Sequence, residues 1–110
     1  MKVISNIRLG SGGNDRKHWR AADRQKRTEK IAIAWALLGR EKPALPCVVT
    51  ITRVSPGNGL DSDNNVAACK YVRDAIADWI GIDDKDEHIV AWRYAQARGP
   101  WGVLIESDPA

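Results

Sequence analysis

One run of apolar, β-branched residues constrains the fold of this chain more than any other stretch. The segment CVVTITRV, residues 47–54, has the composition of a strong β-strand. A helical pattern precedes it, from a cap at Asn14 or Asp15 to about Leu38, with Gly39 as its stop. The second half of this helix is predicted to be amphipathic, because its apolar residues sit mostly at helical spacing: Trp19, Ala22, Ile31, Trp35 and Leu38.

A second helical pattern follows the strand. It runs from Asn64 to Ile80, with Asp63 or Asn64 as its cap and Gly81 as its end. Its apolar stripe consists of Val66, Cys69, Val72, Ile76 and Trp79.

The remaining strands complete an α+β pattern. Lys2–Leu9 is weakly strand-like, and residues 87–97 and 101–106 alternate around a Gly-Pro turn, which predicts a β-hairpin. The expected order is β-α-β-α-β-β, a small mixed sheet with two main helices covering one face. At 110 residues we expect one domain over residues 1–110.

Composition narrows the class of protein. Hydrophobic residues make up 44% and charged residues 28%, as in ordinary globular proteins. No apolar run reaches membrane-spanning length and the start MKVISNIRLG lacks a signal core, so we expect a cytoplasmic protein without a membrane partner. Cys47 and Cys69 are expected to be buried thiols, because two distant cysteines without a secretory context do not indicate a disulfide framework. Their spacing to His18 and His88 matches no usual zinc motif.

Charge divides the chain into two halves. Residues 1–54 hold 12 Lys and Arg against 4 Asp and Glu, whereas residues 55–110 hold 5 against 10. The basic half could neutralise phosphates and the acidic half could hold a cation, or the two could complement each other across a dimer interface. The candidate DNA-binding cations lie on the first helix, where a solvated helix face explains the charge equally well: Arg16, Lys17, Arg20, Arg24 and Arg27.

The acidic half contains a candidate metal site in the stretch from Leu60 to Asp86. Asp61, Asp63 and Asp84 could supply the oxygen ligands that Mg²⁺ or Mn²⁺ prefers, if the chain after Gly81 folds back along the helix. From residue types alone, a helix cap and a polar turn explain these aspartates slightly better. The stretch is not an EF-hand loop, and the chain has no GxGxxG or phosphate-loop pattern, so we expect no small-molecule cofactor.

Taken together, LDSDNN, Lys70, RDAIADWIGIDD and the strand HIVAW resemble the RusA family of Holliday junction resolvases, particularly their short phage and prophage relatives. The resemblance covers residues 48–97 firmly. It extends more loosely to the basic segment NDRKHWRAADRQKRTEKIAIAWALL.

The resemblance implies a homodimeric endonuclease that needs Mg²⁺ or Mn²⁺ and cuts four-way DNA junctions with paired nicks. Asp61, Asp63 and Asp84 match the family's metal-binding catalytic carboxylates. Lys70 matches its essential lysine, and Asn64 matches a motif asparagine that would support the site.

Two departures from the family pattern affect these expectations. Lys70 follows the aspartates at a longer interval than in the founding resolvase, and the loop SPGNG stands where that enzyme has arginines. Charge for junction binding would therefore come largely from the first helix and the dimer partner. The alternatives are a non-catalytic phage DNA-binding protein on the same fold and a small structural protein.

Overall fold

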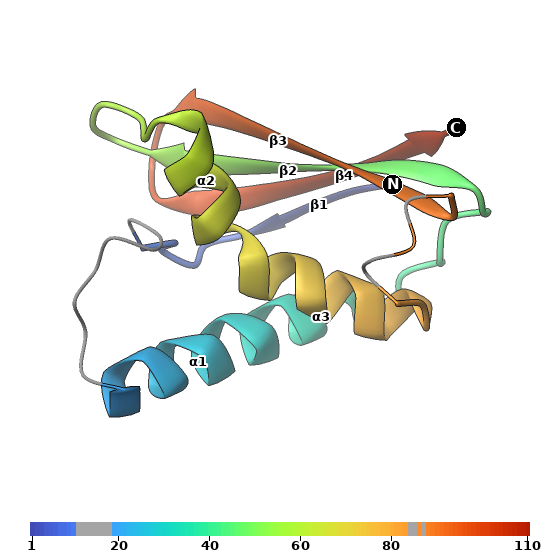
Figure 1. Cartoon of the computed structure of the whole chain (residues 1–110), viewed down its shortest axis with the longest axis horizontal. Coiled ribbons are helices and arrows are strands. Elements are labelled where there is room, and N and C mark those ends of the chain that lie inside the picture. The colour runs from blue at the N-terminus through green and yellow to red at the C-terminus, as the bar shows by residue number, and fades with distance from the viewer. Residues whose placement is uncertain (11–18, 84–85, 87) are drawn as a thin grey trace.

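Strand β2 (Cys47–Ser55) lies inside a four-stranded sheet, hydrogen-bonded on both sides. The computed structural model describes residues 1–10, 19–83, 86 and 88–110. The other elements, in chain order, are β1 (Lys2–Ser5), α1 (Trp19–Leu37), α2 (Ser62–Ala68), α3 (Lys70–Ile80), β3 (Val90–Arg98) and β4 (Gly102–Pro109) (Figure 1).

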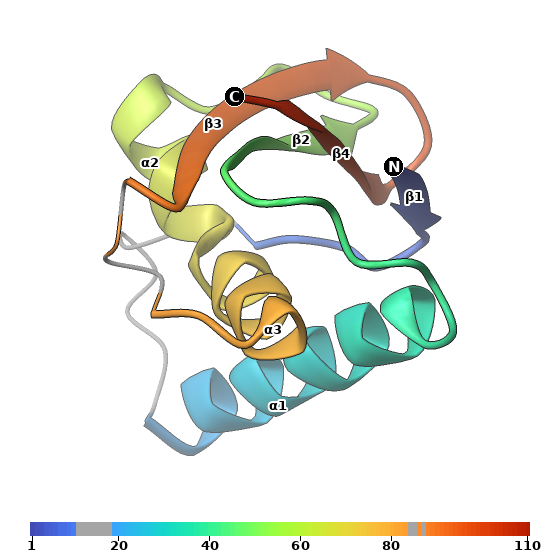
Figure 2. The same ribbon diagram turned by 90° about the vertical axis from the view of Figure 1, so that its right-hand side faces the viewer.

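The sheet is mixed, with the strand order β1-β4-β2-β3. Strand β2 runs parallel to β3 and antiparallel to β4, and β4 runs antiparallel to β1. Helices α1 and α3 both lie on one side of this sheet, and the other side carries no helix among the described residues (Figure 2). The expected α+β class is therefore confirmed.

The expected hairpin between the last two strands is wrong. Strands β3 and β4 are joined by only three residues, 99–101, yet β2 lies between them and pairs with both. Three extended residues reach about 10 Å, which is the width of two strand spacings. Strand β2, which is the richest in β-branched residues, takes one of the two internal places, where its backbone groups are bonded on both edges.

Helix α1 ends close to its expected stop, with Gly39 at a φ of 76° just beyond it. Its expected apolar stripe does not face the core, however. Ile31, Trp35 and Leu38 are exposed, and Ile33 and Leu37 are fully buried against the sheet and α3. The helix is thus apolar on two opposite sides.

The expected helix from Asn64 to Ile80 consists of two helices that meet at Cys69. The backbone there remains hydrogen-bonded, since the amide of Cys69 donates to the carbonyl of Asn65 at 3.1 Å. The N-cap is Asp61 rather than Asp63 or Asn64. Gly81 ends α3 as expected, in the left-handed conformation at a φ of 89°.

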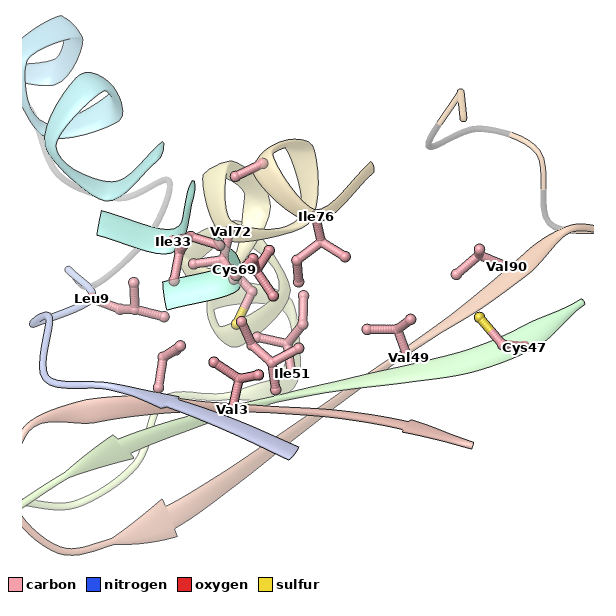
Figure 3. Packing of buried hydrophobic residues seen from close by; sticks show 14 residues of the cluster. Val3, Leu9, Ile33, Cys47, Val49, Ile51, Cys69, Val72, Ile76 and Val90 are labelled. Atoms are coloured by element: carbon pink, nitrogen blue, oxygen red, sulfur yellow. The ribbon is translucent and has the colours of Figure 1, made fainter. Parts of the chain in front are cut away.

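The core fills the space between the helices and the sheet. Figure 3 shows Ile33 of α1 and Val72 and Ile76 of α3 near Ile51 of β2. Each fully buried aliphatic side chain contributes about 1.5–3 kcal/mol to stability. Cys47 and Cys69 are buried free thiols, as expected. In the described part of the chain no helix is long and apolar enough to cross a membrane.

Candidate functional site

The acidic turn, residues 60–63, follows the end of β2. Residues 56–60 carry the chain from Ser55 to Asp61, whose Oδ1 accepts a hydrogen bond from the backbone amide of Asn64 at 3.1 Å. This bond satisfies one of the free amides at the start of α2. One carboxylate oxygen of Asp61 therefore caps the helix, and Asp63 lies in its first turn.

Two side chains hold this turn against β3. The amide of Gln96 clamps the backbone of Leu60, because its Oε1 accepts from the Leu60 N–H and its Nε2 donates to the Leu60 carbonyl, both at 2.7 Å. Gly59 permits this approach, since a Cβ there would lie 2.7 Å from Gln96 Oε1. Asn65, which is buried, donates from Nδ2 to the carbonyl of Ala95 at 3.2 Å. The start of α2 is thus attached to the carboxyl end of β3.

The side chains matched to the resolvase motif are exposed where they are described. Asp61, Asp63 and Lys70 all reach solvent, and Asn64 is half-buried with its backbone bonded to Asp61. Mg²⁺ is commonly held by one or two carboxylates together with water and substrate phosphate. Asp61 and Asp63, on a braced turn, fit that donor set.

The other acidic cluster lies at the opposite end of the fold. Asp83 follows α3, and the carbonyl of Asp86 accepts from the amide of Val90, the first residue of β3. Gln96 lies six residues further along that strand, about 20 Å away. Figure 1 shows α2 and the far end of α3 toward opposite ends of the molecule. Asp83 and Asp86 therefore do not join the Asp61–Asp63 turn, and Asp84 lies outside the described residues.

No cluster of three or more His, Cys, Asp or Glu side chains suited to a metal ion occurs within residues 1–10, 19–83, 86 and 88–110. Three carboxylates do share a hollow with Lys30 beside the end of α3. Asp74, Asp78 and Asp83 line a shallow hollow of about 300 Å³, and Asp78 pairs with Lys30 at 3.4 Å. This hollow is distinct from the acidic turn.

Cations from separate parts of the chain lie near the acidic turn. Arg98, at the end of β3, is exposed and donates from Nε to the carbonyl of Pro56 at 3.3 Å. Arg53 is 5% exposed and donates to Ser55 Oγ and to the carbonyl of Leu9. Its guanidinium lies 5.3 Å from the centre of the Trp101 ring. The turn therefore lies beside a positively charged end of the sheet.

The basic part of α1 lies at this same end of the molecule. Arg20, Arg24 and Arg27 are exposed, and the Lys26 ammonium lies 5.9 Å from the ring of Tyr71, next to Lys70 in α3. Arg27 is partly neutralised by Asp23, with a 2.7 Å ion pair. The other expected DNA-binding residues lie outside the described part of the chain, namely Arg16 and Lys17.

Several residues that shape this site were not expected from the sequence. Gln96, Asn65 and Arg98 have no motif of their own, and their roles follow from the pairing of β3 beside β2. The sequence pattern did mark Gln96 as unusual. It shares the inward face of its strand with Val90 and Tyr94, where another apolar residue would be typical.

Comparisons with known proteins identify no relative. No family model matches the chain, no curated protein matches it, and no solved structure matches it.

Proposed function

We propose that this chain is a RusA-like endonuclease that cuts four-way or otherwise branched DNA with paired nicks, using Mg²⁺ or Mn²⁺. The observation that carries the proposal is the braced, exposed pair Asp61 and Asp63 at the positively charged end of the fold. A carboxylate pair fits a hard divalent cation, and the surrounding cations fit a DNA backbone.

The residues of the site divide metal binding, charge stabilisation and positioning in the proposed reaction. Asp61, through the oxygen that does not cap α2, and Asp63 hold the metal ion. The family resemblance also implies Asp84, but its neighbours Asp83 and Asp86 lie about 20 Å from this turn in the same copy, so the proposed site rests on Asp61 and Asp63. The bound metal would acidify the attacking water and stabilise charge on the leaving oxygen. Lys70 faces the scissile phosphate and offsets its developing charge. Gln96 holds the turn, so that the carboxylates are positioned before DNA arrives.

The assembly and location belong to the same proposal. Two copies act together, since symmetric nicks on two strands need two active sites, and the protein works in the cytoplasm. Arg20, Arg24 and Arg27 of each copy contact phosphates, with Arg16 and Lys17 extending that surface. These contacts position the DNA without reading its sequence.

The test is cleavage of a synthetic four-way junction by purified protein with Mn²⁺ or Mg²⁺. We expect nicks at symmetric positions on two opposing strands. Asp63→Asn should abolish cutting and retain binding, because the amide keeps the shape of the side chain and loses its charge. Asp108→Asn is the matched control, since Asp108 is an exposed aspartate at the opposite end of the sheet.

A junction that stays intact through long incubation with either metal would contradict the proposed activity. Cutting by Asp63→Asn at the wild-type rate would point to a contaminating nuclease.

A second candidate is a non-catalytic DNA-binding protein on the same fold. It is favoured by the absence of a three-carboxylate cluster among the described residues and by the capping role of Asp61. This candidate predicts salt-sensitive junction binding that is unchanged by Mg²⁺ and by Asp63→Asn.

A further inference from the structure

Helix α1 carries a second apolar side that faces away from the core. Trp35 is 70% exposed, Leu38 69% and Ile31 57%. They follow one another at intervals of four and three residues, so they form one stripe. Residues 31 and 35 are each two positions from the buried Ile33 and Leu37, or about 200° around the helix. Packing within one copy therefore leaves this stripe uncovered.

A groove lies beside the stripe, between α1 and α3. It has a volume of about 490 Å³, and its lining includes Ile31, Ala34, Leu38, Ala75 and Trp79. Its charged edge holds the ion pair of Lys30 and Asp78 at 3.4 Å. Adjacent exposed apolar side chains beside an apolar hollow are typical of a protein interface.

We infer that this face joins two copies of the chain across a two-fold axis. The face presents a projecting ring, Trp35, next to a groove that Trp35 does not line. A two-fold axis brings the same patch together from both copies, so each Trp35 can enter the other copy's groove. A Trp side chain can bury about 150–250 Å² in this way, and such rings often dominate interface energies.

The surface size and charge also fit a second copy. A standard interface takes about 800 Å² from each partner, and this chain exposes 6939 Å² in total. Such an interface would take about a ninth of that surface. Both signs of charge occur at the rim, in Lys30 and Asp78, so the face lacks the surplus of cations that a DNA contact would use.

The inference rests on the proposed function for its purpose, because paired nicking needs two copies. The inference also assigns DNA binding and dimer contact to different halves of one helix. Along the outward side of α1, Arg20, Arg24 and Arg27 precede Ile31, Trp35 and Leu38 at the same helical spacing. The first half of that side is thus left to DNA and the second half to the partner copy.

The test is the mass of the purified chain in solution, by light scattering and sedimentation, without DNA or metal. We expect twice the 12.2 kDa of one chain. Trp35→Glu and, separately, Ile31→Lys should raise the dimer dissociation constant by about a hundredfold, with unchanged circular dichroism. Ile4→Glu is the matched control, because Ile4 is 68% exposed on the helix-free face of the sheet.

The inference is overturned by a single-chain mass at every concentration, by a dimer that survives both α1 substitutions, or by loss of the dimer in Ile4→Glu alone. Association and cleavage are measured separately. A chain that dimerises through Trp35 but leaves junctions intact supports this surface and contradicts the proposed activity, and a monomer that cuts junctions does the reverse.

Discussion

Cys69 occupies the point where α2 meets α3, and its side chain is fully buried. Burial raises the pKa of this thiol from 9.0 to about 12, because the thiolate would lose its hydration. The nearby guanidinium of Arg53 lowers the pKa only in part. The thiol is therefore protonated and unreactive at neutral pH, and its role is in packing.

This pKa predicts a loss of stability in alkali. The unfolded chain ionises Cys69 above about pH 9, whereas the folded chain resists ionisation until about pH 12, so the free energy of unfolding falls between these values. By pH 10.5 the loss from this thiol should be about 2 kcal/mol. Urea unfolding at pH 8 and pH 10.5 measures it.

The control is Cys69→Ala, which lacks this thiol and keeps every other side chain of the protein. The variant should lose less stability than the wild type over the same pH interval. Equal losses in the two proteins would show that Cys69 does not set this pH dependence.

At the scale of secondary structure, the sequence predicted which segments are helices and strands better than it predicted which strands pair with each other. Periodicity located α1, α2 with α3, and all four strands, because side-chain spacing is a local property. The sequence wrongly predicted that β3 pairs with β4, because a three-residue link between two alternating segments has the local pattern of a hairpin. Insertion of β2 between them depends on competition for the sheet centre, which acts between segments far apart in sequence.

The candidate site shows the same limit. Residue types and the family resemblance indicated a group of four, Asp61, Asp63, Asp84 and Lys70. Asp84 lies outside the described residues, and the other three are exposed. The clamp of Gln96 on Leu60 spans 36 positions and exists only because β3 lies parallel to β2. The helix also begins earlier than expected, at Ser62, because its cap is Asp61 and not Asp63 or Asn64.

The start of α2 gives a prediction that separates capping from metal binding. Asp61→Ala removes the side-chain acceptor for the Asn64 amide and should lower the free energy of unfolding by about 1 kcal/mol. Asp61→Asn keeps an oxygen acceptor and should cost far less stability. Both variants should lose metal-dependent cutting, because both remove the carboxylate.

Chemical denaturation gives the stability of each variant, and junction cleavage gives its activity. Full cutting by Asp61→Asn would show that Asp61 caps the helix and does not bind the metal ion. Equal stability of Asp61→Ala and wild type would show that water replaces the cap at no cost.

At the scale of the whole molecule, the helical layer faces two directions at once. The inner sides of α1 and α3 bury the core against one face of the sheet (Figure 2). The outer side of α1 is basic in its first half and apolar in its second. The acidic turn lies at the same end of the molecule as the basic half of α1, so the charge division of the sequence is reproduced in space only in part (Figure 1).

That arrangement predicts a ranking among the cations. Arg24 is exposed and forms no ion pair in the described part of the chain, whereas Arg27 is already bonded to Asp23 at 2.7 Å. Binding of a junction by Arg24→Ala should be weaker than wild type at low salt. The slope of log K against log salt should shrink by about 0.9 for the lost phosphate contact.

Arg27→Ala should change both quantities less, because DNA binding by Arg27 must first compete with its ion pair to Asp23. Arg93→Ala is the matched control, since Arg93 is exposed on the helix-free face of the sheet. Fluorescence anisotropy in chelator, on an Asp63→Asn background, measures binding without cutting. An equal loss in all three variants would mean that net charge alone drives binding, whereas the ranking Arg24, Arg27, Arg93 would place the DNA along the first half of α1.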